Sequence, residues 1–370
     1  MTIDLALLNT LPATLQLNFP DRASITLTRI RSEKRGGSAL MWMGRSDDCG
    51  ALFDVFADGS FKSTISCLDA QYGVDHPSGS ANLRLSRYDN AGMGTNEEPS
   101  PGLPAGVTPS GFGPLTTLGG PDQTVDILVL FNGSMTTTPI WNVAQYAVDQ
   151  TQMAMVQSTS PGQPTIAQLK LAGAARISRT VVNNPSGDLS YLQSDPQTAA
   201  LRNYWAADAI VYITPGTGPS LGISYLPQNG GLPPPGPAFA PWAIAVSLAT
   251  YATNPGDYVF AHELAHTFGA NHNQDHAPAN PTPVEPWAFG RWAKEPESGI
   301  GSRSIMAYVQ ECTGSPCDRI LHYSNPDVYV DGWFRTGLNN ANNARLINEI
   351  APIEAQYRAS VGRIFADGFE

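Results

Sequence analysis

The sequence predicts an α+β protein in two parts, because a segment of short strands precedes a longer stretch in which strands alternate with amphipathic helices. The first part covers residues 1–98 and is predicted to be mostly β. Residues 99–121 are predicted to form a linker, since six Pro and six Gly fall between residues 95 and 124 without a hydrophobic period. The larger part covers residues 122–361, and a short tail follows at residues 362–370. A chain of 370 residues is long enough for two cores.

Two patterns indicate strands in the first part. Residues 24–30 alternate apolar with polar side chains, as a half-buried strand does. Residues 51–65 predict a hairpin that turns at Asp58-Gly59, a strong turn dipeptide. A small core is expected from six large side chains: Trp42, Phe53, Val55, Phe56, Phe61 and Tyr72.

The second part is expected to open with a strand at residues 125–131, a near-continuous apolar run typical of a strand buried on both faces. An amphipathic helix follows at residues 141–158, with Trp141, Ala144, Val148 and Met155 near one face. The remaining expected elements are strands at residues 169–177 and 209–213, a helix capped by Asp195 that runs to Tyr204, a central strand at residues 243–248 and a packing helix within residues 338–357.

One short segment places three His, one Glu and one Gly at the spacing of a catalytic zinc site. His262 and His266 are four residues apart, so on a helix both rings reach one metal ion. Gly269 can take the left-handed conformation that ends a helix, which lets His272 return as a third ligand. Glu263 lies beside them, and the fourth zinc position stays free for water. Histidines that merely cap or pack a helix end would explain one His but not three with a Glu.

Both ends of this helix carry signals in the sequence. Asn254 is expected to cap it, Pro255 suits the first helical position and Asp257 complements the positive end of the helix dipole. The helix is expected to stop at Gly269.

The H-E-x-x-H-x-x-G-x-x-H pattern resembles that of the metzincin zinc metallopeptidases, and bacterial reprolysin-like and astacin-like members in particular. The resemblance implies a twisted, mainly parallel sheet, an active-site helix and a zinc cleft between two subdomains. The methionine turn of that clan is matched at residues 304–308. Met306 would then form an apolar floor under the imidazoles without binding zinc. Tyr308 matches a tyrosine that astacins and serralysins swing toward the metal, whereas other metzincins keep a structural tyrosine there, and both roles stay open.

Two further segments have metzincin counterparts. Residues 1–98 loosely resemble the pro-domains that precede bacterial metzincin catalytic domains, and the alternative is an unrelated β module that binds substrate or partner. Residues 221–225 stand where a metzincin carries the edge strand that pairs with an extended substrate. The surrounding Pro/Gly-rich residues 215–242 would line the cleft or form a mobile surface loop.

The four cysteines fall into two local pairs, Cys49 with Cys67 and Cys312 with Cys317, which suggests two disulfides formed in an oxidising compartment. An alternative uses Cys49 or Cys67 as a thiolate that occupies the fourth zinc position of a silent proenzyme.

Composition excludes several classes of partner. The net charge of −11 and the lack of a basic cluster argue against nucleic acids and anionic membranes, and no apolar run is long enough for a membrane span. No signal peptide is recognisable at the start, so the chain is either cytosolic or has lost its export signal. The cysteine pairs favour a secreted protein, and the resemblance to bacterial metzincins implies a bacterial source.

We therefore expect a secreted zinc endopeptidase, made as a proenzyme, that acts on proteins or peptides with Glu263 as the general base. The alternative is a catalytically silent, zinc-stabilised binding or adhesion protein. Asp275 is a candidate to orient His272, while His276 and His322 are treated as ordinary histidines. Structural Ca²⁺ has no support, because no Asp/Asn/Gly array forms a calcium loop.

Overall fold

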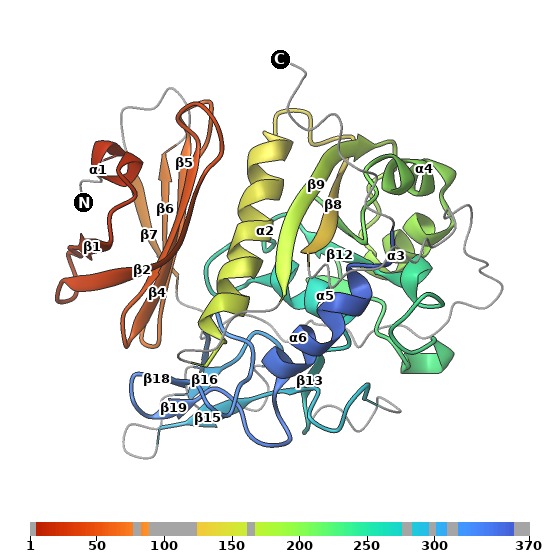
Figure 1. The fold of residues 1–370 in the computed structure, drawn as a ribbon. Helices are drawn as coiled ribbons and strands as arrows, with labels where there is room; N and C mark the ends of the chain where they lie inside the picture. The colour runs from red at the N-terminus through yellow and green to blue at the C-terminus, as the bar shows by residue number, and fades with distance from the viewer. Residues whose placement is uncertain are drawn as a thin grey trace.

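Two sheets, separated by one long helix, organise the chain (Figure 1). The computed structural model describes residues 5–76, 83–88, 124–160, 167–275, 283–295, 301–308 and 317–358. The predicted linker at residues 99–121 and the tail at residues 362–370 lie outside the described residues. The fold is a mixed α/β one, and the described part of the chain contains six α-helices.

The first sheet is an antiparallel meander of seven strands in sequence order. A short helix, α1 (Leu5–Asn9), precedes it. Its strands are β1 (Thr14–Leu17), β2 (Ile25–Lys34), β3 (Leu40–Arg45), β4 (Cys49–Val55), β5 (Phe61–Cys67), β6 (Gln71–His76) and β7 (Arg84–Tyr88). The hairpin predicted at Asp58-Gly59 is confirmed, and Gly59 has the positive φ of 78° that the turn requires.

The second sheet has five strands in the order β11-β12-β10-β8-β9, and four of them are parallel. Its parallel strands are β8 (Thr124–Asn132), β9 (Gln168–Ile177), β10 (Ala209–Thr214) and β12 (Ile244–Leu248). The short β11 (Gly222–Ser224) runs antiparallel to β12 at the edge, where the sequence predicted an edge strand. The prediction that residues 243–248 form the central strand was wrong, because β12 lies next to the edge and β10 is in the centre.

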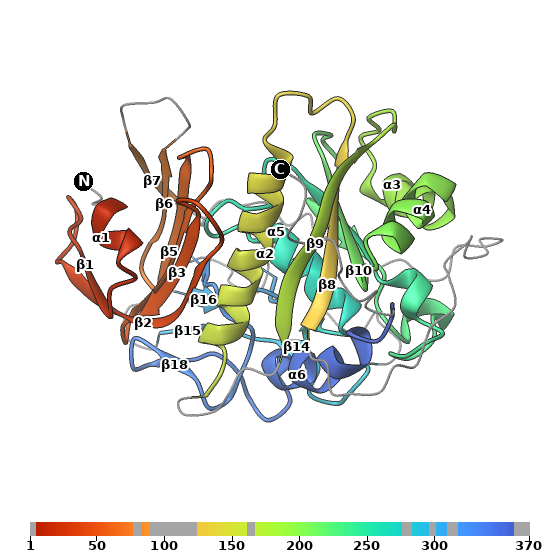
Figure 2. The ribbon, with the colours of Figure 1, turned by 45° about the horizontal axis from the view of Figure 1, so that its top comes forward.

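Helices cover both faces of this sheet, as Figures 1 and 2 show. On the face toward the first sheet lie α2 (Ile140–Gln157) and the short α5 (Val259–Thr267), which contact each other. On the opposite face lie α3 (Pro185–Ser194) and α4 (Pro196–Tyr204). The last helix is α6 (Asn343–Glu354), and two 3₁₀ turns lie at Asn229–Gly231 and Ala240–Trp242.

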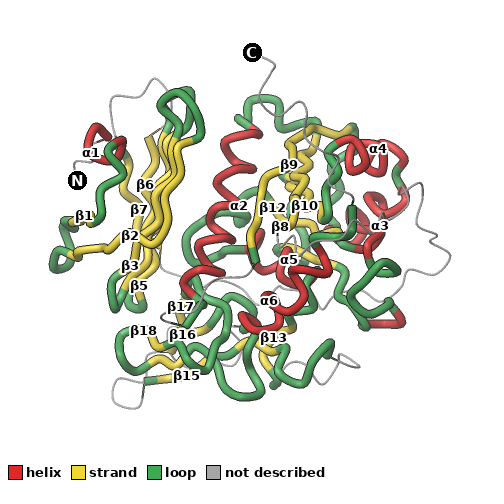
Figure 3. Tube along the Cα trace, in the orientation of Figure 1, coloured by secondary structure: helices red, strands yellow, loops and turns green. Residues whose placement is uncertain are grey.

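Small strands fill the lower part of the molecule in Figure 3, where loops dominate. They are β13 (Asn271–Asn273) with β14 (Phe289–Gly290), β15 (Trp292–Lys294) with β16 (Gly301–Arg303) and β17 (Cys317–Arg319), and β18 (Tyr329–Val330) with β19 (Phe334–Arg335). Within the residues that the structure describes, no helix is both long enough and apolar enough to span a membrane.

The two sheets share one core through α2. Met41, Met43, Leu52 and Phe56 from the first sheet are buried in the same hydrophobic cluster as the second sheet. Phe56 therefore does not belong to the small separate core in which the sequence placed it, whereas the other five predicted side chains do. Polar contacts add to the packing across this interface, since Thr64 is hydrogen-bonded to the Tyr146 hydroxyl and to the Gln150 amide of α2. 

Two predicted helices are confirmed. The amphipathic helix at residues 141–158 is α2, although Trp141 is 48% exposed and packs edge-on against Trp205, with 5.8 Å between ring centroids. The packing helix expected within residues 338–357 is α6, which begins after Asn342, whose side chain accepts a hydrogen bond from the backbone of Arg345. Helix α3 was not predicted at all.

Candidate metal centre

Helix α5 carries two of the three histidines and ends as the sequence predicted. Gly269 has a φ of 94°, and it forms the left-handed turn that stops the helix. The Ala270 N–H donates to the Ala265 carbonyl, and the Gly269 N–H donates to the His266 carbonyl, which together are the two bonds of a Schellman motif. The chain then reverses into β13, which places His272 opposite the helix.

The start of α5 differs from the prediction. Asn254 is not its N-cap and Pro255 is not its first residue, because the helix begins at Val259. Gly256, with a φ of 86°, and Tyr258, with a φ of 48°, are both in the left-handed region, which breaks any helix between them. Asp257 therefore lies in a turn before the helix and does not extend its first turn.

Three imidazoles converge on one point. Nε2 of His272 lies 3.2 Å from Nε2 of His262 and 3.1 Å from Nε2 of His266. All three rings are buried. In the described residues, this trio is the one group of His, Cys, Asp or Glu side chains whose ligand atoms come together closely enough for a metal ion.

Hydrogen bonds at the outer nitrogens decide what the inner nitrogens can do. Nδ1 of His262 lies 2.9 Å from the Ile305 carbonyl, and Nδ1 of His266 lies 2.7 Å from the Ala270 carbonyl. A carbonyl only accepts, so both Nδ1 atoms carry the proton and both Nε2 atoms present a lone pair. Ligands of a tetrahedral zinc ion at 2.0–2.1 Å are about 3.3 Å apart, close to the spacing here. The donor set therefore fits Zn²⁺.

Burial also favours the neutral form of His262. Burial is the main cause that lowers the pKa of His262 well below its ordinary value of 6.5, and its neighbours His266, when protonated, and Arg319 act in the same sense. A neutral imidazole is the form that binds a metal ion.

Glu263 belongs to α5, and its side chain packs against the edge strand β11. Its side chain is buried, and a Cβ placed on Gly222 would lie 2.6 Å from Cγ and 2.7 Å from Oε1 of Glu263. Because Gly222 has no side chain, there is space beside it for the Glu263 carboxylate. This arrangement brings a carboxylate, the edge strand of the sheet and three histidines into one region of the molecule.

The segment around Met306 supports the histidines from the other side. Met306 is fully buried, and its backbone packs against Gly290, where a Cβ would lie 2.8 Å from the Met306 carbonyl carbon. The ring of Tyr308 lies against the ring of His272, with 4.1 Å between centroids and 33° between planes. The Tyr308 N–H donates to Oδ1 of Asn273, at 3.0 Å, which fixes the turn beside β13.

A model of metallo-peptidase family M12 matches residues 133–316, which include all of these side chains. Residues 133–316 belong to metallo-peptidase family M12. This segment is thus a zinc metallopeptidase domain, and the metzincin resemblance of the sequence is confirmed.

The chain matches 81 chains of solved structures, and three of them are compared with it below. The first, described as a chaperone–substrate complex, has 14% identity and a TM-score of 0.46, and the match covers 82% of this chain and 44% of that one. Metalloproteinase-II from Bacteroides fragilis has 12% identity and a TM-score of 0.41, with 74% and 85% covered. Archaemetzincin from Methanopyrus kandleri has 14% identity and a TM-score of 0.27, with 43% and 81% covered. The chain thus spans less than half of the first of these chains, and a search of curated proteins found no match.

The cysteines of the metallopeptidase are bonded as predicted where the structure describes them. Cys49 and Cys67 form a disulfide between β4 and β5. The alternative in which one of them serves as a free thiolate on zinc was therefore wrong. Cys317 is also disulfide-bonded, and its predicted partner Cys312 lies outside the described residues, as does His276.

Sequence reasoning missed several residues that hold the site. The Ile305 carbonyl and Asn273 were not singled out, although both adjoin predicted site residues. Arg303 was missed too, and its guanidinium donates to the Ala307 carbonyl at 2.7 Å inside the methionine turn. Asp275 is exposed and accepts a hydrogen bond from the Trp292 indole at 3.2 Å.

Proposed function

We propose that His262, His266 and His272 hold one zinc ion and that Glu263 is the general base in the hydrolysis of peptide bonds. The observation that carries the proposal is the convergence of three Nε2 atoms at 3.1–3.2 Å, with two of the rings oriented by backbone carbonyls. The family match supports peptides or proteins as substrates.

Bound zinc supplies Lewis acidity, which polarises the scissile carbonyl and lowers the pKa of a water molecule. Glu263 takes the proton from that water and passes it to the leaving amine. Its burial beside Gly222 supports this role, because a carboxylate held in one place needs little rearrangement before proton transfer.

The remaining residues position the substrate and the ligands. The edge strand β11 pairs with β12 on one side, and its other edge can pair with an extended peptide through main-chain hydrogen bonds. Tyr308 holds the ring of His272 by stacking, and Met306 forms the apolar floor beneath the imidazoles.

Export and activation complete the proposal. Two disulfide-bonded sites support an oxidising compartment, and hence secretion. The Pro/Gly-rich residues 99–121 suit a proteolytic cut that converts a proenzyme into the mature form. Casein hydrolysis measured before and after limited cutting of this linker tests activation, and equal activity in both samples would contradict a proenzyme.

Substitution of Glu263 tests the catalytic role directly. We expect Glu263→Ala to keep one zinc per chain but to lower casein hydrolysis at least ~1,000-fold, since general-base catalysis contributes about 10²–10⁴-fold. Glu349→Gln, on the exposed face of α6, is the matched control and is expected to keep full activity. Residual activity of Glu263→Ala within tenfold of the wild type would refute the role, and zinc binding without hydrolysis in the cut wild-type chain would favour a silent binding protein.

A further inference from the structure

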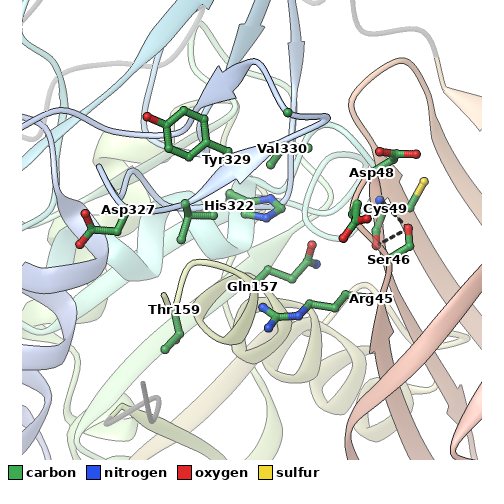
Figure 4. A pocket seen from close by; sticks show the side chains of 13 residues that line it. Arg45, Ser46, Asp48, Cys49, Gln157, Thr159, His322, Asp327, Tyr329 and Val330 are labelled. Carbon is green, nitrogen blue, oxygen red and sulfur yellow. Dashed lines mark hydrogen bonds between the residues drawn. The ribbon is translucent and has the colours of Figure 1, made fainter. Parts of the chain in front are cut away.

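A polar cavity of about 490 Å³ lies outside the metal centre, where three parts of the chain meet (Figure 4). The turn between β3 and β4 forms one wall, with Arg45 and Asp48. The C-terminal end of α2 contributes Gln157, and the segment that begins at His322 closes the other side. The volume lies in the range of about 300–1,000 Å³ that small-molecule sites have.

Two buried side chains inside the cavity have polar atoms without a partner. Nε2 of Gln157 and Nδ1 of His322 make no hydrogen bond, although Gln157 is 3% and His322 is 8% exposed. A buried amide or imidazole nitrogen without a partner is energetically unfavourable. In Figure 4 both side chains reach into the space between the surrounding segments. These atoms point to a polar ligand.

The cavity is lined by side chains of both charges. Arg45 is half-buried, and its guanidinium makes no hydrogen bond or ion pair with the described residues. Burial, and then the charge of Arg45, lower the pKa of His322 to about 3, so this imidazole is neutral at neutral pH. Among the carboxylates, Asp47 and Asp327 are exposed, and Asp48 is half-buried as Arg45 is.

We propose that this cavity binds a small zwitterion with a carboxylate and an ammonium group, such as a free amino acid or a dipeptide. Arg45 and the Gln157 amide donate to the carboxylate in the inner part of the cavity, and Asp48 with Asp327 attracts the ammonium group at the rim. An anion alone would be repelled by the three Asp side chains of the rim. The products of peptide hydrolysis carry these two charges. The suggestion that such products are the natural ligands rests on the proposed function, whereas the binding site itself does not.

One residue connects the cavity with the metal centre. The Ile305 N–H donates to the His322 carbonyl at 2.8 Å, and the Ile305 carbonyl accepts from Nδ1 of His262 at 2.9 Å. Because a shift of His322 moves the partner that orients His262, an occupied cavity is expected to change the hold of the three histidines on zinc.

Calorimetric titration of the full chain with alanyl-alanine tests the site. We expect the zinc-loaded wild type to bind alanyl-alanine saturably. The same binding is expected when a hydroxamate already occupies the metal centre. Arg45→Met and Gln157→Leu are expected to weaken it at least tenfold, whereas Arg84→Met, which removes an exposed arginine of β7, leaves it unchanged. Thermal melts show whether each variant is folded, and two independent variants keep the result interpretable if one is not.

Two blocked dipeptides test the ligand class. N-acetyl-alanyl-alanine lacks the ammonium group and alanyl-alanine amide lacks the carboxylate, so both are expected to bind at least tenfold more weakly. No binding of alanyl-alanine at 10 mM, binding that the two variants leave unchanged, or competition by the hydroxamate would each overturn the proposal. None of these readouts uses peptidase activity, so failure here is distinct from failure of the proposed catalytic roles.

A separate measurement tests the coupling between the cavity and the three histidines through Ile305. The rate at which a chelator removes zinc is expected to change more than twofold when alanyl-alanine is present, and to stay constant in Arg45→Met. An unchanged rate in the wild type at saturating dipeptide would contradict the coupling.

Discussion

The Tyr258 hydroxyl donates a hydrogen bond to Oε1 of Gln71 at 2.6 Å, and both side chains are buried. Gln71 belongs to β6 of the first sheet, and Tyr258 immediately precedes α5. The Tyr258 carbonyl in turn accepts from the N–H of His262 at 2.9 Å. The first sheet is therefore hydrogen-bonded to the residue that precedes α5, at the N-terminal end of the helix that carries two of the converging histidines.

Removal of this hydroxyl is expected to destabilise the folded chain. Tyr258→Phe leaves Oε1 of Gln71 buried without its partner, which costs about 1–3 kcal/mol. Urea unfolding of the zinc-loaded chain measures the loss in the free energy of unfolding. The double variant with Gln71→Leu is expected to lose less than the sum of the two single variants, because no polar atom is then left unpaired. Additive losses would show that the two side chains do not interact.

We expect the first sheet to remain attached after the linker is cut. Arg35 binds both carboxylate oxygens of Asp149 on α2, at 2.5 and 2.6 Å, and the shared core lies next to this pair. The nicked wild type should elute as one species in size-exclusion chromatography. Arg35→Met should weaken the association of the pieces at least tenfold, since a hydrogen bond between charged groups contributes about 1.5–3 kcal/mol. Arg84→Met, which removes an exposed ion pair, is the control, and separation of the wild-type pieces would contradict the prediction.

Local signals predicted that the three histidines come together, because their spacing depends on one helix and one turn. Two histidines four residues apart and a glycine with positive φ are sufficient to bring His272 back. The Cys49–Cys67 pair was also accessible, since the cysteines lie on neighbouring strands of a meander.

Features that depend on distant contacts could not be predicted. The start of α5 was misplaced because the left-handed Tyr258 is held by Gln71, 187 residues away. The position of β12 was wrong, since β10 and β12 are apolar runs of similar length, six and five residues, and nothing in them indicates which lies in the centre. Helix α3 has local signals, with Asn184 as N-cap and Pro185 at its first position. It was not predicted because its apolar residues repeat only weakly at the helical period.

Gly222 is expected to be required for catalysis. A Cβ at this position lies under 3 Å from the Glu263 side chain, so Gly222→Ala displaces the carboxylate. A displacement of about 1 Å at a reacting group can lower the rate about 100-fold, while the three histidines are untouched. Casein hydrolysis and zinc content measure the two effects separately. Gly187→Ala, where the nearest atom to the new Cβ is 3.4 Å away, should behave as wild type, and full activity of Gly222→Ala would show that Glu263 has room to move.

Tyr308 is expected to affect zinc affinity through its ring. The ring packs on His272, so Tyr308→Phe should retain zinc affinity and Tyr308→Ala should lower it about 10-fold or more, as the loss of an outer-shell contact does. Competition with a chelating dye measures the affinity. If Tyr308→Phe also keeps its rate of casein hydrolysis, the tyrosine is structural, whereas a slower rate at full zinc content assigns a catalytic role to the hydroxyl.

His322 is expected to make stability depend on pH between about 5 and 7. Its pKa falls from an ordinary 6.5 to about 3 in the folded chain, so below pH 6.5 the unfolded chain binds a proton that the folded chain does not. Stability therefore decreases as the pH falls from 6.5 toward 3, by about 2 kcal/mol at pH 5. His322→Gln should lose that much less free energy of unfolding than the wild type between pH 7 and pH 5, as urea unfolding at both pH values would measure. Protonation of the three converging histidines contributes equally to both chains. Equal pH dependence of the wild type and His322→Gln would mean that His322 is protonated in the folded chain as readily as in the unfolded one.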